Sequence, residues 1–186
     1  MSMLPWQQKQ WAQVAAAAAG GRLPHALLLT GPDGIGLTEF ALHVAGSLLC
    51  QRASAEAPQC GQCRACVLVQ AGNHPDIRRV SPEEPGKQIR VEEIRTLLEF
   101  MHLSSQSGRY KVAIIDPADA MNRSAANGLL KTLEEPPAGS ILMLCCHQPG
   151  RLPITIRSRC QQLGFNSDCG AATQQWLAQR LGADAG

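Results

Sequence analysis

Short runs of consecutive apolar residues alternate along this chain with stretches in which apolar residues recur every three or four positions. Continuous apolar runs bounded by turn residues are typical of buried strands, and the three-to-four spacing is typical of helices with one buried face. The pattern predicts strands at residues 25–30, 77–80, 111–116, 141–146 and 161–165. It predicts helices at residues 4–19, 37–49, 66–70, 91–103, 122–133 and from 168 to about 181. Because strands alternate with helices, we expect an α/β fold with a largely parallel sheet and helices on both faces.

The bulk composition fits one ordinary domain and the start of a second. The chain has 186 residues, of which 45% are apolar and only 4% aromatic, so the core should consist mostly of Leu, Ile, Val and Ala. A change of composition near Asn166 places the main domain at residues 1–166 and the truncated start of another at 167–186. The net charge of +2 points neither toward nucleic acid nor away from it. No membrane-length apolar run and no secretory signal is evident, which predicts a cytoplasmic protein.

Half of the eight cysteines cluster with the spacing C-x9-C-x2-C-x2-C. The clustered residues are Cys50, Cys60, Cys63 and Cys66. Thiolates at such short gaps can surround Zn²⁺ tetrahedrally, so residues 50–66 are predicted to form a structural zinc module. A disulfide framework is the alternative, but it suits a short secreted chain better than this one. The remaining cysteines, interpreted as buried free thiols, are Cys145, Cys146, Cys160 and Cys169.

A glycine-rich loop with the spacing G-x4-G-x-T lies between the first predicted strand and the helix at 37–49. A strand, a glycine turn and a helix form the context in which backbone N–H groups hold phosphates. The positions that would keep this geometry are Gly31, Gly34, Gly36 and Thr38. Leu37 replaces the lysine that reaches the β- and γ-phosphates in a working loop, so weak nucleotide binding could survive but hydrolysis should not. The alternative is that the glycines only build a turn.

Two more positions depart from those of an active phosphate-loop ATPase. The central strand ends in Asp116, but Pro117 follows it where a glutamate would polarise the attacking water. At the end of the next strand, Cys145 and Cys146 take the place of the polar residue that senses the γ-phosphate, and a thiol is a poor hydrogen-bonding group. Together with the missing lysine, these departures predict that the chain has lost the ability to hydrolyse ATP.

Three segments carry a resemblance to a known family. They are Ala-Ala-Asn-Gly-Leu-Leu-Lys-Thr-Leu-Glu-Glu-Pro-Pro at residues 125–137, Leu-Pro-Ile-Thr-Ile-Arg-Ser-Arg-Cys at 152–160, and the cysteine module at 50–66. With these segments the chain resembles the bacterial clamp-loader AAA+ family over nearly all of residues 4–165. The resemblance implies a P-loop NTPase-type sheet of five parallel strands between helices. It also implies that residues 167–186 begin a small helical lid domain.

The resemblance implies a function as well. ATPase members of the family carry the lysine and an Asp-Glu pair, so Leu37 and Pro117 favour a non-hydrolysing stator subunit of the DNA polymerase III clamp loader. Such a subunit would help to load the sliding clamp on primed DNA during replication, together with the gamma/tau ATPase subunits and the delta subunit. In the Ser-Arg-Cys motif, Arg159 would be an arginine finger that reaches ATP bound by the neighbouring subunit. On the sequence alone, a surface salt bridge is the simpler interpretation of Arg159.

Two other functions stay open at this point. One is an active clamp-loader ATPase of the gamma/tau type with an unusual loop. The other is a zinc-dependent nucleic-acid-binding module. Arg52 and Arg64 are the only basic residues within the cysteine module, which is too few to follow a phosphate backbone. ATP turnover by the isolated chain would distinguish the active ATPase from the stator subunit. The salt dependence of DNA binding by the chain alone would test the nucleic-acid-binding module.

Overall fold

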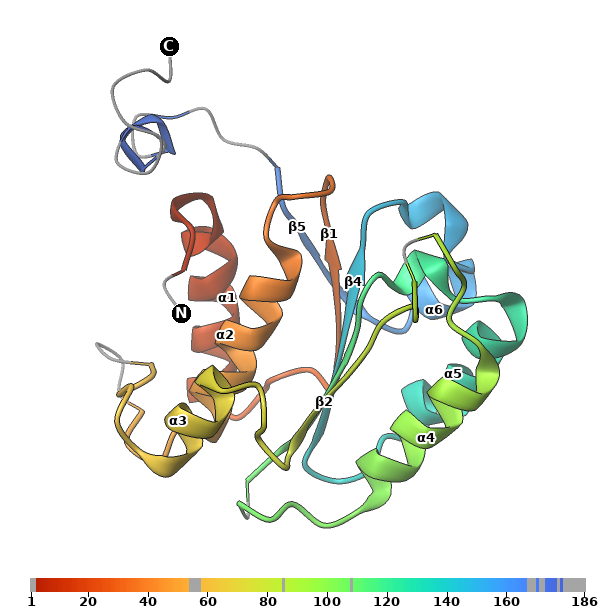
Figure 1. Cartoon of the computed structure of the whole chain (residues 1–186), viewed down its shortest axis with the longest axis horizontal. Helices are drawn as coiled ribbons and strands as arrows, with labels where there is room; N and C mark the ends of the chain where they lie inside the picture. The colour runs from red at the N-terminus through yellow and green to blue at the C-terminus, as the bar shows by residue number, and fades with distance from the viewer. Residues whose placement is uncertain are drawn as a thin grey trace.

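The computed structural model describes residues 3–53, 58–84, 86–107, 109–166, 170, 173–176 and 178. Its centre is a sheet of five parallel strands in the order β2-β3-β4-β1-β5 (Figure 1). The strands are β1 (Ala26–Thr30), β2 (Ile77–Val80), β3 (Lys111–Ile115), β4 (Ser140–Cys146) and β5 (Gln161–Gly164). The predicted five-stranded parallel sheet is confirmed, and every strand begins and ends within one residue of its expected bounds.

Helices cover both faces of this sheet. The α-helices are α1 (Gln8–Ala19), α2 (Leu37–Leu49), α3 (Arg64–Gln70), α4 (Val91–His102), α5 (Arg123–Glu134) and α6 (Ile154–Arg157). The 3-10 helices of the described chain are η1 (Pro5–Gln7), η2 (Ala118–Ala120) and η3 (Pro149–Arg151). The sequence pattern did not predict α6, because a helix of four residues is too short to show a helical period.

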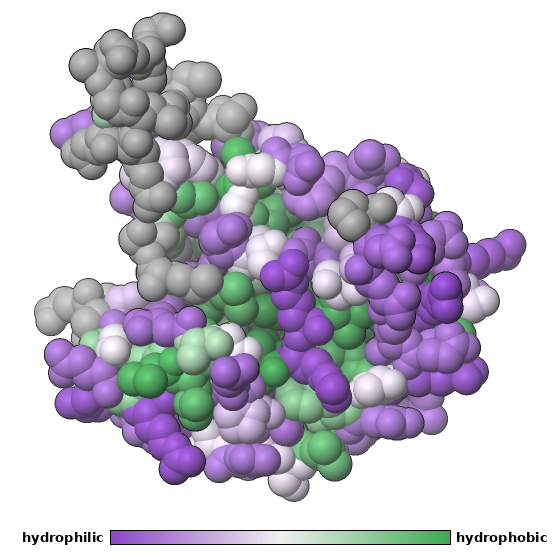
Figure 2. All heavy atoms as spheres, in the orientation of Figure 1, coloured by the Kyte–Doolittle hydropathy of each residue, from purple (hydrophilic) through white to green (hydrophobic). Residues whose placement is uncertain are grey.

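The core is divided into two layers by the sheet. Successive side chains of a strand point to opposite faces. Leu27 and Leu29 of β1 therefore pack with α1, α2 and α3. Ala26 and Leu28 pack with α4, α5 and α6 on the other face, and Figure 1 shows the two groups of helices on opposite sides. Because both faces are covered, the interior positions of the central strands are apolar, which explains the continuous apolar runs. On the side of the molecule that Figure 2 shows, most of the surface is hydrophilic.

The carboxyl ends of all five strands meet at one edge, because the strands are parallel. The segments that leave β1, β2, β3 and β4 at this edge begin with Gly31, Ser81, Asp116 and His147. Ligands of open α/β sheets usually bind outside the carboxyl ends of the strands. The glycine-rich loop connects β1 to α2 here, so this edge holds the candidate nucleotide site.

The predicted lid domain at residues 167–186 lies mostly outside the described residues. Residues 173–176 and 178 are helical. Trp176 contacts Trp6 edge to face, with the ring centroids 5.4 Å apart. The lid domain and its boundary at residue 166 therefore stay a prediction. None of the described helices combines the length and the apolar character that crossing a membrane requires.

Candidate functional site

The predicted zinc module brings its four cysteines together at the end of α2. The four sulfur atoms lie within 4.8 Å of one another, and the Cys50–Cys63 and Cys60–Cys66 pairs are each 4.0 Å apart. A tetrahedron of thiolates with Zn–S bonds of about 2.3 Å has edges of about 3.8 Å. A disulfide would need an S–S distance of about 2.0 Å, and these cysteines are free. The arrangement therefore fits a four-thiolate metal site and not a pair of disulfides.

The backbone of the module favours negative charge on sulfur. The backbone N–H groups of Cys60, Cys63 and Cys66 each donate to the sulfur of the preceding cysteine in the sequence, at 3.3 to 3.5 Å. Hydrogen bonds from the backbone of Gln62 and Cys63 lower the pKa of Cys60 to about 6. Burial raises the pKa of Cys66 to about 12, so ionisation of all four thiols needs the field of a bound cation. A site of four thiolates with no open position suits structural zinc.

Contacts with α2 and with the chain before β3 fix the module to the body of the protein. The amide of Gln59 donates to the His43 carbonyl at 2.8 Å and lies 3.2 Å from Nδ1 of the same histidine. Gly46 makes room for this amide, because a Cβ there would come within 2.8 Å of it. Nη1 of Arg109 donates to the Cys50 carbonyl at 3.1 Å. These contacts couple the cysteine cluster to the sheet and its helices.

The glycine-rich loop has the backbone shape that its sequence predicts. Gly34 and Gly36 adopt φ angles of +76° and +87°, which residues with a Cβ rarely adopt. The N-terminal segment supports the loop from behind. The Trp6 indole donates to the Ile35 carbonyl at 2.9 Å, and the fully buried Gln7 amide donates to the Gly36 carbonyl at 2.7 Å. Sequence reasoning missed these supports, because they join segments that are about thirty residues apart.

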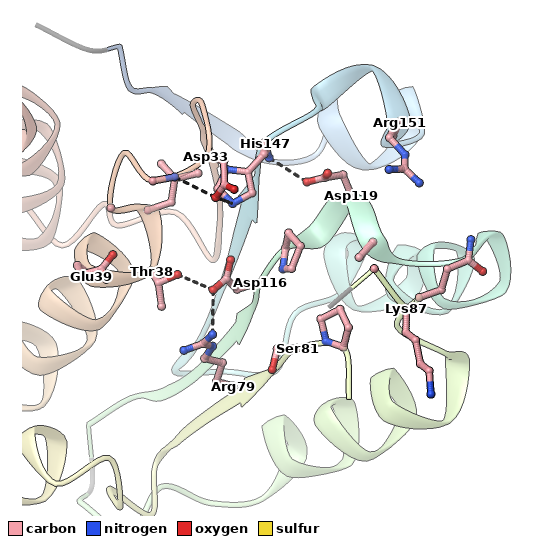
Figure 3. Close-up of a pocket in the computed structure, with 18 of the residues that line it drawn as sticks. Asp33, Thr38, Glu39, Arg79, Ser81, Lys87, Asp116, Asp119, His147 and Arg151 are labelled. Carbon is pink, nitrogen blue, oxygen red and sulfur yellow. Dashed lines mark hydrogen bonds and ion pairs between the residues drawn. The ribbon is translucent and has the colours of Figure 1, made fainter. Parts of the chain in front are cut away.

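In a working phosphate-loop ATPase, a hydroxyl and a carboxylate bind Mg²⁺. The corresponding groups of this chain are hydrogen-bonded to each other (Figure 3). Thr38 Oγ1 donates to Asp116 Oδ2, and Nη2 of Arg79 lies 3.2 Å from the same oxygen. Asp116 is 6% exposed, so its charge is neutralised mainly by this arginine of β2. Leu37, in the position of the missing lysine, is 2% exposed and offers no charge. No local pattern in the sequence indicates Arg79, because its contact with Asp116 depends on β2 lying beside β3.

The end of β4 carries the two cysteines that the sequence interprets as buried free thiols. Cys145 and Cys146 are both free and fully buried, so this interpretation is confirmed. They point to opposite faces of the sheet, and helices cover both faces. Burial raises the pKa of Cys145 well above its ordinary value and that of Cys146 to about 12, so both remain neutral thiols. The polar residue that follows β4 is His147, whose Nδ1 donates to the Gly31 carbonyl at 3.2 Å.

A cleft of about 1020 Å³ lies in front of the loop, between the segments that follow β1 to β4 (Figure 3). Its described basic lining residues are Arg79, Lys87, His147 and Arg151. Its described acidic lining residues are Asp33, Glu39, Glu84, Asp116 and Asp119. Acidic and basic groups are thus mixed, and Arg79 and Lys87 are each paired with a carboxylate. This lining lacks the concentrated positive charge that a triphosphate needs.

Arg159 lies beyond the end of α6 and is not among the described residues that line the cleft. Its side chain is 36% exposed, and Nη2 is 2.6 Å from Oε1 of Glu134 on α5. The structure therefore brings together the predicted loop residues, and separately the predicted metal ligands, but it does not bring Arg159 to the cleft of its own chain.

Comparison with known sequences agrees with the resemblance. The sequence profile of the family described as DNA polymerase III, delta subunit, matches residues 6–168. DNA polymerase III subunit delta' of Pseudomonas aeruginosa is 49% identical, over 95% of this chain and 53% of that protein. The delta' subunit of Escherichia coli K12 is 37% identical, over 87% of this chain and 48% of that protein. DNA polymerase III subunit tau/gamma of Haemophilus influenzae is 36% identical, over 95% of this chain and 26% of that protein.

This chain spans about half the length of the curated delta' proteins that it matches. Among solved structures, a DNA polymerase III gamma subunit-related protein of Thermotoga maritima matches with a TM-score of 0.68 at 21% identity. That match covers 92% of this chain and 51% of the other. The Thermotoga maritima RuvB Holliday junction branch migration motor matches with a TM-score of 0.53 at 19% identity, over 88% of this chain and 44% of the other. At these identities the structural matches show a shared fold.

Proposed function

This chain belongs to the protein family described as DNA polymerase III, delta subunit, and we propose that it acts as a clamp-loader subunit that does not hydrolyse ATP itself. Relatives named delta' include the one with the highest identity quoted above, which favours the delta' role over the tau/gamma role. In this role the chain is a stator: it completes the ring of subunits that opens a sliding clamp at primed DNA.

The proposed lack of ATPase activity is supported above all by the contacts of Asp116. Both the Thr38 hydroxyl and the Arg79 guanidinium contact its Oδ2. Phosphoryl transfer depends on positioning and on positive charge around the phosphates, supplied largely by Mg²⁺ and the loop lysine. Here the carboxylate already has a protein cation, and Leu37 supplies none. Pro117 follows Asp116, so the side-chain base that would polarise water is absent from that position.

In this proposal the chain contributes Arg159 to ATP hydrolysis on the neighbouring subunit, where its guanidinium contacts the bound nucleotide. Its guanidinium is partly exposed and lies outside its own cleft, as a group that acts in trans requires. An arginine supplied in this way contributes about 10³–10⁵ in rate. The proposed partners are the gamma/tau ATPase subunits, the delta subunit and, through the assembly, the sliding clamp and primed DNA.

The cysteine module holds structural zinc in this proposal. The residues Cys50, Cys60, Cys63 and Cys66 would fill all coordination positions, so the metal would have no open site for chemistry. Its contribution would be to fold residues 50–66 against α2.

The test uses the full-length protein, alone and assembled with its ATPase subunits. We expect no ATP turnover by the protein alone. Arg159→Ala should leave folding and assembly intact, and should lower hydrolysis at the neighbouring site by about 10³-fold or more. Turnover by the protein alone would favour the ATPase alternative, and unchanged hydrolysis in the variant assembly would refute the role of Arg159.

A further inference from the structure

The guanidinium of Arg159 is held in a defined orientation by two acceptors. Nε and Nη2 donate to Oε1 of Glu134 at 3.0 and 2.6 Å. Nη1 donates to the Thr155 carbonyl at 2.9 Å. Glu134 is the last residue of α5 and Thr155 belongs to α6, so the contacts fix the arginine between two helices of the same face.

The three hydrogen bonds leave a specific part of the guanidinium available. Arginine carries five N–H donors, one on Nε and two on each terminal nitrogen. Within the described part of the chain, one donor therefore remains on Nη1 and one on Nη2. Donors on the two terminal nitrogens form a planar fork that can bind two oxygens of a phosphate. The contact with Glu134 thus restrains Arg159 without consuming its terminal fork.

The pair of Glu134 and Arg159 is poorly placed to stabilise the fold. The two side chains are 53% and 36% exposed, and solvent-exposed ion pairs contribute little to stability. In addition, Glu134 ends α5, where a carboxylate faces the negative end of the helix dipole. A neutral residue or a cation would favour the helix more. The position is therefore explained better by what the carboxylate does to Arg159 than by the stability of α5.

We propose that Glu134 is a positioning residue, which accepts hydrogen bonds from Nε and Nη2 of Arg159. These contacts orient the remaining N–H donors toward the terminal phosphoryl group of a nucleotide on a neighbouring subunit. This inference rests on the proposed function of Arg159. A free arginine side chain samples many rotamers, whereas a held one is oriented before the partner binds, so less conformational freedom is lost in the transition state.

The experiment uses full-length protein assembled with its ATPase subunits, and measures single-turnover ATP hydrolysis over a range of ATP concentrations. Glu134→Ala should slow hydrolysis at the neighbouring site by about tenfold, with ATP affinity and assembly unchanged. Glu134→Gln should slow it less, because its amide oxygen still accepts from Nε. Glu135→Ala is the matched control, because Glu135 is exposed and no side-chain contact of it is seen in the described chain. This control should be as fast as the unchanged protein.

A double variant separates positioning from a general structural effect. Arg159→Ala with Glu134→Ala should be no slower than Arg159→Ala alone, because Glu134 acts only through the arginine. If Arg159→Ala slows hydrolysis while Glu134→Ala leaves it unchanged or accelerates it, the positioning role is wrong and the proposed function stands. If Arg159→Ala itself has no effect, the proposed function and this inference are both wrong.

Discussion

The hydroxyl of Thr38 at the start of α2 donates a hydrogen bond to the carboxylate of Asp116 at the end of β3, 78 residues further along the chain. In an ATPase of this fold, a bound Mg²⁺ would lie between two such groups. Their direct contact, together with the arginine that shares Asp116, means that a nucleotide with its metal would have to break both interactions. The glycine loop therefore keeps its shape, but the two groups that would bind Mg²⁺ are bonded to each other and to Arg79.

This arrangement predicts that restoring the lysine alone will not restore nucleotide binding. Leu37→Lys should bind ATP with Mg²⁺ weakly, because Asp116 remains paired with Arg79. Leu37→Lys combined with Arg79→Ala should bind at least about tenfold more tightly, which corresponds to about 1.4 kcal/mol. Calorimetric titration with ATP and Mg²⁺ measures the difference.

The control for this experiment is the neighbouring arginine of β2. Arg78 lies over the Phe100 ring at 5.8 Å and does not contact Asp116 in the described structure. Leu37→Lys combined with Arg78→Ala should therefore gain nothing. Equal affinities with and without Arg79 would show that the arginine does not block the site. None of these variants should hydrolyse ATP, because Pro117 remains.

A second prediction concerns a buried ion pair on the opposite edge of the sheet. Asp76 is fully buried, accepts hydrogen bonds from the backbone of Gln106 and Ser107, and lies 3.2 Å from Nζ of Lys111. Burial opposes the ionisation of Asp76, but these hydrogen bonds and Lys111 outweigh it and lower its pKa from 3.8 to about 2. A carboxyl whose pKa is lower in the folded state stabilises the fold above its unfolded pKa and loses that contribution as the pH falls through its folded pKa.

Asp76→Asn should lower the free energy of unfolding at neutral pH by about 3–5 kcal/mol, because it leaves Lys111 as an unpaired buried charge. Ser105→Ala is the control: it removes one hydrogen bond to the same carboxylate and should cost only about 1 kcal/mol. Urea denaturation measures both variants. The difference between the unchanged protein and Asp76→Asn should shrink as the pH is lowered from 3.8 to about 2, and a difference that does not change with pH would contradict the assignment.

Features whose signal lies within one segment could be predicted from the sequence. The helix at 37–49 has its predicted bounds, because the glycine loop sets its start and its apolar period runs to its end. The four cysteines of the predicted metal site also come from one short segment. Arg79 and His147 could not be assigned, because their partners depend on which strands are neighbours in the sheet. The pairing of Arg159, which follows α6, with Glu134 of α5 likewise has no local signal.

A third prediction is that one tightly bound zinc will be found per chain. Cys63→Ser should abolish that stoichiometry and make residues 50–66 more sensitive to protease. If the loop is unfolded without metal, the variant loses the apparent free energy of zinc binding, which is up to about 10–16 kcal/mol. Elemental analysis of protein purified under reducing conditions tests the metal. Cys145→Ala, which changes a buried thiol of the core, should leave the zinc content unchanged. Protein that carries no metal under these conditions would contradict the assignment.

The last prediction concerns Gly46, which lies within α2 directly beneath the side chain of Gln59. In most helices, Gly→Ala stabilises the fold by about 0.5–1 kcal/mol. Here the new Cβ would lie 2.8 Å from the Gln59 amide, which must then leave its contacts with His43. Each lost hydrogen bond costs about 1 kcal/mol, so the two losses exceed the helical gain. We expect Gly46→Ala to destabilise the metal-loaded protein by about 1 kcal/mol.

The sign of this effect should depend on Gln59. In a Gln59→Ala background the amide is absent, so Gly46→Ala meets no obstacle and should stabilise the protein by about 0.5–1 kcal/mol. Urea denaturation of the four proteins in this cycle, each loaded with zinc, gives the coupling between the two positions. Stabilisation by Gly46→Ala in both backgrounds would mean that the amide moves aside freely. In that case the packing of Gln59 on α2 would not be what holds the cysteine module against the helix.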